Sequence, residues 1–70
     1  MYGCIITVKS ITYALKGEAL LKKRGIECSV VKVDGSEHGC RYGIALSCRA
    51  LTSAVTILSG GGVEIGKIIS

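Results

Sequence analysis

The middle of the chain, residues 26–48, reads IECSVVKVDGSEHGCRYGIALSC, in which two apolar, strand-like stretches flank a polar loop. Residues 26–33 are rich in β-branched side chains, which favour strands, and residues 43–48 form a second short apolar run. No helical pattern separates the two runs, so two strands are expected to follow each other directly here. The rest of the fold prediction builds outward from this pair.

A strand and a helix are predicted before this pair. Residues 2–9 read as a strand, and Ser10 can cap a helix over residues 11–24. Gly25 is placed to end that helix, because glycine adopts the left-handed conformation of a helix C-terminus without strain.

A second helix and a last strand are predicted after the pair. Residues 49–59 place apolar side chains on one side of a helix, residues 60–62 are a glycine triplet that ends it, and residues 63–69 supply a strand. The order β-α-β-β-α-β predicts an α+β fold of ferredoxin-like type, a two-layer sandwich in which a four-stranded antiparallel sheet carries two helices on one face. Residues 1–70 show no linker or repeat, so a single domain is expected.

Composition limits the function classes. The chain is 49% hydrophobic but has neither Trp nor Phe, and a core of 70 residues stabilises a fold only modestly, which leaves room for a homodimer. The net charge of +4 is mild, and the cluster at residues 22–24 suits a helix C-terminus. An acidic protein partner fits this charge, whereas only three tyrosines are available to stack on nucleic-acid bases, so nucleic-acid binding is not favoured.

The expected location is the cytoplasm, away from membranes. No apolar run approaches the roughly 20 residues needed to cross a bilayer, and Met1 leads straight into a strand-like segment without the pattern of a signal peptide. In a reducing compartment we expect the four cysteines to be free thiols, metal ligands or catalytic groups before disulfides.

Cys40 is the candidate reactive residue. It lies in the loop between the two middle strands, where Gly39 and Gly43 would leave its sulfur accessible. His38 and Arg41 could favour the thiolate, which is the nucleophilic form of cysteine.

Lys9 and Ser10 are expected at the same sheet edge as the Cys40 loop, because the first helix begins where the first strand ends. Free backbone N–H groups at a helix start, together with the Lys9 charge, would favour an anion such as a thiolate or persulfide. The alternative is that Ser10 only caps the helix.

The other three cysteines are predicted at the opposite end of the sheet. Right-handed crossovers make the first two strands parallel, with the third between them, and this places Cys4, Cys28 and Cys48 together. Cys40 and Cys48 would be about 26 Å apart at roughly 3.3 Å per residue, too far for a disulfide. Three thiolates could begin a zinc or iron–sulfur site, but the close spacing of familiar sites is missing, so no metal or other cofactor is expected.

Glu18 lies within the predicted apolar arc of the first helix, which Ile11, Ala14, Leu15, Ala19 and Leu21 outline. A carboxylate near buried surface could act as a proton carrier. The plainer interpretation is that the helix is slightly rotated and that Glu18 pairs with Lys22 one turn on.

The chain resembles the selenium/sulfur carrier protein-like family over nearly its whole length. The residues that carry the resemblance are Ile5-Ile6-Thr7-Val8-Lys9-Ser10, Ala14-Leu15, Glu18-Ala19-Leu20-Leu21, Gly25-Ile26 and Gly39-Cys40. Relatives tend to have Pro and Arg before the cysteine and often Gly directly after it. This chain instead has Asp34-Gly35-Ser36-Glu37-His38 before Cys40 and Arg41-Tyr42 after it.

The resemblance implies a carrier function for Cys40. Such a protein holds sulfur or selenium as a persulfide or selenosulfide and passes it from a protein donor, such as a cysteine desulfurase, to an acceptor enzyme. The chain would then be a carrier more than a stand-alone enzyme, which agrees with its lack of a phosphate loop or an enclosed catalytic cleft. The alternative is a non-catalytic protein-interaction module in which Cys40 is structural.

Overall fold

The structure is a computed structural model that describes residues 2–33 and 42–69. In this part of the chain, the elements are β1 (Cys4–Val8), α1 (Ile11–Lys23), β2 (Cys28–Lys32), β3 (Tyr42–Leu46), the short 3-10 helix η1 (Cys48–Ala50), α2 (Leu51–Gly60) and β4 (Ile65–Ile69). The predicted order β-α-β-β-α-β is confirmed. The strands are shorter than predicted, and η1 precedes the second helix.

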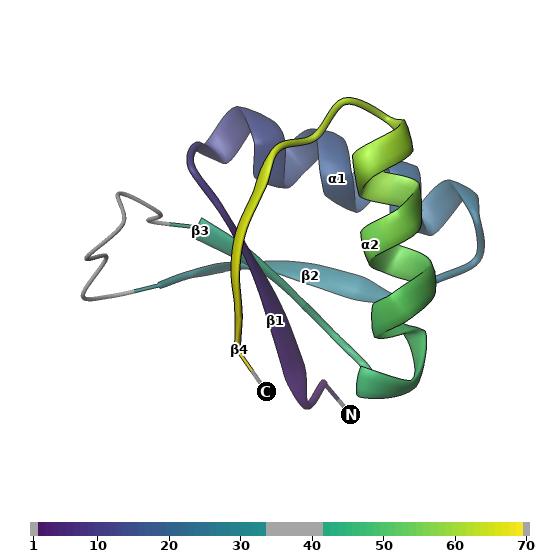
Figure 1. The fold of residues 1–70 in the computed structure, drawn as a ribbon. Coiled ribbons are helices and arrows are strands. Elements are labelled where there is room, and N and C mark those ends of the chain that lie inside the picture. The colour runs from purple at the N-terminus through teal and green to yellow at the C-terminus, as the bar shows by residue number, and fades with distance from the viewer. Residues whose placement is uncertain (1, 34–41, 70) are drawn as a thin grey trace.

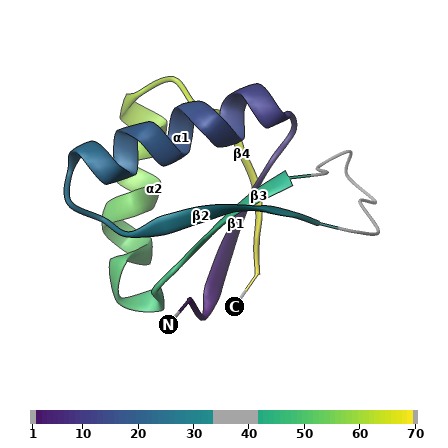
Figure 2. The same cartoon turned by 180° about the vertical axis from the view of Figure 1, so that it is seen from behind.

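The described strands form one sheet in the order β2-β3-β1-β4, and each neighbouring pair is antiparallel. Both helices lie on one face of this sheet, as Figures 1 and 2 show from opposite sides. The fold is therefore the predicted two-layer α+β sandwich. β3 lies between β1 and β2, as predicted.

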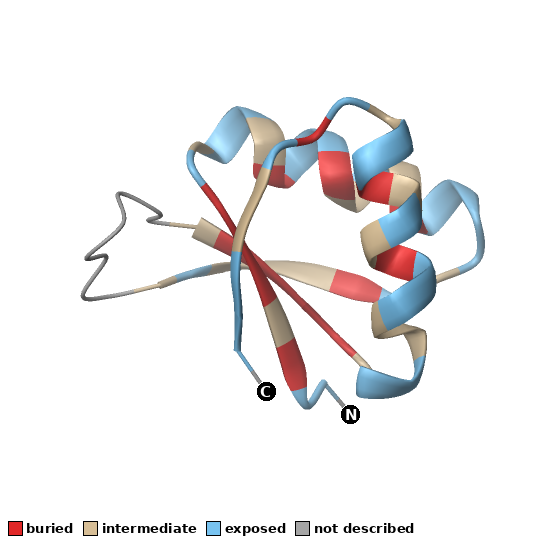
Figure 3. Cartoon of the chain, in the orientation of Figure 1, coloured by how far each residue is buried: buried red, intermediate tan, exposed pale blue. Residues whose placement is uncertain are grey.

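The core lies between the sheet and the helices (Figure 3). Alternate residues of β1 point toward the helices, and Cys4, Ile6 and Val8 are all buried. Antiparallel register places Leu46 opposite Cys4 and Ile44 opposite Ile6, so β3 contributes its own buried side chains to the same layer. The helices close the layer with small and branched residues, which are Ala14, Leu21, Ala54 and Leu58.

The first helix is rotated relative to the apolar arc that the sequence predicts. Its buried residues are Ala14, Gly17 and Leu21, whereas Leu15 is 54% exposed. A Cβ atom at Gly17 would lie 2.6 Å from Cδ1 of Ile44, so the missing side chain lets the helix backbone approach the sheet. The predicted arc was therefore wrong on the side of Ile11, Leu15 and Ala19, because those residues are exposed.

This rotation brings Glu18 to the edge of the buried face. Its carboxylate Oε2 lies 3.6 Å from Nζ of Lys22, one turn along the helix. The plainer interpretation of Glu18, an ion pair on a rotated helix, is confirmed.

The helices end in the same way. Gly25 and Gly62 both have a φ of 79°, the left-handed conformation that favours glycine. The N–H group of Ile26 donates to the carbonyl of Leu21 at 2.9 Å, and that of Val63 donates to the carbonyl of Leu58 at the same distance.

Among the described residues, no helix has the length and apolar character needed to span a membrane.

Gly43 is a packing residue of β3. It is buried, and a Cβ atom added to it would lie 2.6 Å from Cγ2 of Ile5 and 3.3 Å from the carbonyl oxygen of Ile6. The Cγ2 methyl group of Ile5 is bonded directly to Cβ, and the carbonyl oxygen of Ile6 is part of the backbone. Neither atom can therefore move away easily. β3 therefore requires glycine here for close packing.

We predict that Gly43→Ala lowers the free energy of unfolding by about 1–3 kcal/mol, the usual cost of overpacking. Gly60→Ala is the matched control, because nothing lies within 4 Å of a Cβ at that position. Urea denaturation of both variants measures the difference. Equal stability of Gly43→Ala and the native chain would contradict the packing role.

Candidate functional site

The sheet edge predicted to carry the reactive loop can be located from the strand register. Tyr42, at the start of β3, pairs with Val8 at the end of β1 and with Lys32 at the end of β2. Lys9 and Ser10 follow Val8 directly, so they lie at the edge to which the segment between β2 and β3 is attached. This relative placement agrees with the sequence prediction.

Four of the predicted site residues, His38, Gly39, Cys40 and Arg41, lie outside the described residues. Their roles stay predictions. Gly43, also predicted to give access to Cys40, lies inside β3 and is buried, and the strand packing described above is a sufficient reason for glycine there.

Ser10 and Lys9 make contacts of their own. The Ser10 hydroxyl accepts a hydrogen bond from the backbone N–H of Tyr13 at 3.3 Å, so Ser10 caps α1 as predicted. Nζ of Lys9 lies 3.5 Å from Oε1 of Glu64, in an ion pair whose side chains are both exposed. The first turn of α1 contains no acidic residue, so the electrostatics of this helix start still favour an anion.

The opposite end of the sheet holds the other three cysteines, as predicted. Cys4 and Cys28 both pair with Leu46, from the two sides of β3, and Cys48 follows Leu46 by two residues. Within the described part of the chain, no group of three potential ligands could hold a metal ion.

Cys4 and Cys48 form a disulfide, with their Cα atoms 5.2 Å apart. The expectation of free thiols in preference to disulfides was therefore wrong for this pair. It rested on the usual redox state of a compartment, whereas geometry decides which sulfurs can meet. Because Leu46 lies opposite Cys4 and the chain turns at Ser47 into η1, Cys48 is brought back to the start of β1. Because Cys48 is bonded to Cys4, it has no free thiol to bond with Cys40, in agreement with the prediction.

Cys28 is a free thiol that is protected from solvent. The residue is only 3% exposed, and its Sγ donates to the backbone carbonyl of Glu18 at 3.8 Å. Burial raises the pKa of the Cys28 thiol and the negative charge of Glu18 raises it further, while Lys22 acts in the opposite direction. A thiol in this setting is a poor nucleophile near neutral pH.

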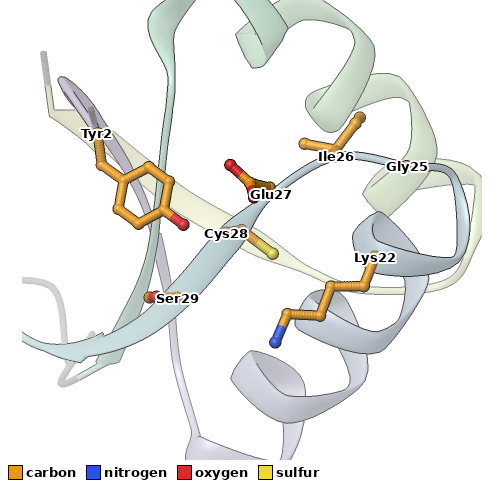
Figure 4. Close-up of a pocket in the computed structure, with 7 residues that line it drawn as sticks. All are labelled: Tyr2, Lys22, Gly25, Ile26, Glu27, Cys28 and Ser29. Atoms are coloured by element: carbon orange, nitrogen blue, oxygen red, sulfur yellow. The ribbon is translucent and has the colours of Figure 1, made fainter.

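A shallow hollow of about 430 Å³ lies between the end of α1 and the start of β2. Figure 4 shows Lys22, Glu27 and Tyr2 around it, with Cys28 in its wall. A second hollow of about 530 Å³ also includes Tyr2 and continues to Ser47 and Ala50, on either side of Cys48 in sequence. Sequence reasoning missed both hollows, because they combine segments that lie far apart in the chain.

The chain matches the family described as "Putative Se/S carrier protein-like" over residues 3–70. The match covers almost the whole sequence, so the protein belongs to this family of selenium/sulfur carrier-like proteins. No curated protein and no solved structure matches it. The family assignment confirms the resemblance from the sequence, and the fold is the one expected.

We predict that reducing the disulfide lowers the free energy of unfolding by about 4 kcal/mol, since the bond constrains an unfolded loop closed across 44 positions. Urea titration of the native chain with and without reductant measures this loss. In the control, Cys4→Ala combined with Cys48→Ala, reductant should change nothing. Equal stability of the oxidised and reduced native chains would show that the bond does not stabilise the fold.

We also predict that alkylation of Cys28 in the folded protein needs a higher pH than alkylation of the same residue in urea, because its pKa is raised on folding. The midpoint of the pH–rate profile, followed by peptide mass mapping, separates ionisation from simple access. Glu18→Gln removes one cause of the shift and should move the midpoint part of the way back. Identical midpoints in folded and unfolded protein would refute this account of Cys28.

Proposed function

We propose that this protein is a sulfur or selenium carrier in which Cys40 holds the transferred atom as a persulfide or selenosulfide. A protein donor, such as a cysteine desulfurase, would load Cys40, and an acceptor enzyme would remove the atom. The chain would supply a thiol and a docking surface and would catalyse no reaction alone. The expected setting is the cytoplasm, where such donors and acceptors act.

The observation that supports this proposal is the state of the three cysteines in the described residues. Cys4 and Cys48 are bonded to each other, and Cys28 is buried with a raised pKa. A carrier needs an exposed and ionisable thiol, and none of these three supplies one in the state that the structure shows. Family membership calls for a carrier cysteine, and Cys40 is the candidate that remains.

The surroundings of the sheet edge give secondary support. The start of α1 and the Lys9 side chain lie at the edge to which the Cys40 segment is attached. Positive potential at a helix start stabilises a nearby anion by roughly 0.3–1 kcal/mol at exposed sites. This is a modest contribution, suited to a bound atom that must later be released.

The transfer itself is a simple exchange at sulfur. The Cys40 thiolate attacks the outer sulfur of the donor persulfide, a new S–S bond forms at Cys40, and the donor cysteine leaves as a thiolate. The outer sulfur keeps its proton, so no oxidant or reductant is needed. Removal by the acceptor repeats the same exchange in the opposite sense.

We predict that Cys40→Ser abolishes loading by a cysteine desulfurase supplied with cysteine, because the attacking thiolate is lost. Intact-mass spectrometry without reductant detects loading as an added ~32 Da, the mass of one sulfur atom bound to a reactive thiol. Cys28→Ser is the matched control, since it removes a buried thiol and leaves the disulfide intact. Equal loading of the two variants would remove Cys40 from the proposal.

A further inference from the structure

The two cysteines of the disulfide differ in their exposure to solvent. Cys4 lies in β1 under the helices and is 1% exposed, whereas Cys48 begins η1 at the surface and is exposed. Thiol–disulfide exchange begins when a thiolate attacks one sulfur of the bond, and access decides which sulfur is attacked. The burial pattern therefore singles out Cys48.

A glycine and an arginine lie close to Cys48. A Cβ atom at Gly3 would lie only 3.3 Å from Sγ of Cys48, so glycine leaves one side of this sulfur without a neighbouring side chain. Gly3 is itself exposed. Arg49, also exposed, adds a positive charge that favours an approaching thiolate.

We propose that the Cys4–Cys48 disulfide is a reversible redox pair that reacts with thiols through Cys48. The reacting partner is a thiolate, either of a small thiol or of a protein dithiol. This is a second sulfur centre, at the end of the sheet opposite to the edge where the Cys40 segment is attached, and it does not depend on whether Cys40 carries sulfur.

The reaction proceeds in two exchanges. A first thiolate attacks Sγ of Cys48 and forms a mixed disulfide with it, while Cys4 leaves as a thiolate and takes up a proton. A second thiolate then attacks the partner's sulfur in the mixed disulfide and releases the Cys48 thiolate, which is also protonated. The chain gains two electrons and two protons, and the two partner thiols become a disulfide.

Cys28 is not positioned to bond to Cys4. β3 separates it from Cys4, and two strand spacings amount to roughly 10 Å, beyond the Cα separation of about 7 Å that a disulfide allows. The strand order therefore excludes a disulfide between Cys4 and Cys28.

The test uses the full chain carrying Cys40→Ser, so that its result is independent of the carrier proposal. The oxidised protein is incubated with glutathione in one arm and with reduced thioredoxin in the other, then quenched in acid and alkylated for peptide mapping. We expect glutathione on Cys48 and the alkyl group on Cys4 in the first arm, or alkyl groups on both Cys4 and Cys48 in the second. Reaction in one arm alone identifies the source of the thiol and supports the pair.

Two results would overturn the proposal. One is glutathione attached to Cys4 as readily as to Cys48. The other is reduction that occurs in both arms only after the protein unfolds. In that case the rate of disulfide reduction rises steeply with urea concentration, even below the unfolding midpoint. Exchange in the native state leaves the rate nearly independent of low urea.

Gly3→Val provides a second test that keeps both cysteines. Its side chain would crowd Sγ of Cys48 and should slow the reaction with glutathione several-fold. Gly60→Val is the control, because position 60 has no neighbour within 4 Å of an added Cβ. Equal rates for the two variants would show that Cys48 is not the point of attack.

Discussion

The antiparallel pairing of β1 with β3 is the constraint on which the rest of this structure depends. One register places Cys4 opposite Leu46 at one end of the sheet and Val8 opposite Tyr42 at the other. The first pair brings Cys48 back to the start of β1, and the second brings the beginning of α1 to the edge where the Cys40 segment is attached. A shift of one residue would move every buried side chain of β1 to the other face, so the core holds this register in place.

Most of the fold could be predicted from local sequence. β-branched runs marked the strands, Ser10 marked the start of α1, and Gly25 marked its end with the left-handed conformation that the structure shows. The rotation of α1 could not be read from its apolar pattern alone. It depends on the close approach of Gly17 to Ile44 in β3, which is a contact between distant parts of the chain.

The cysteines show where sequence reasoning succeeded and where it failed. Topology placed Cys4, Cys28 and Cys48 at one end of the sheet, because handedness and strand order are enough for that. Whether two of them bond depends on a turn after β3 that the predicted strand, running on to Cys48, left out. η1 supplies this turn, and the disulfide follows from it. The candidate site was predicted only as far as its edge of the sheet, since Lys9 and Ser10 are described and Cys40 is not.

The disulfide also closes a covalent ring of the chain from Cys4 to Cys48, with the last strand and α2 as a tail outside it. β1, α1, β2 and β3 belong to this ring, and so does the segment that contains Cys40. A protease that cut the backbone once inside the ring would leave both pieces joined through sulfur. The two fragments would lose their covalent link only when a reductant cleaves the disulfide. The redox state of this one bond would therefore decide whether a nicked molecule stays covalently intact.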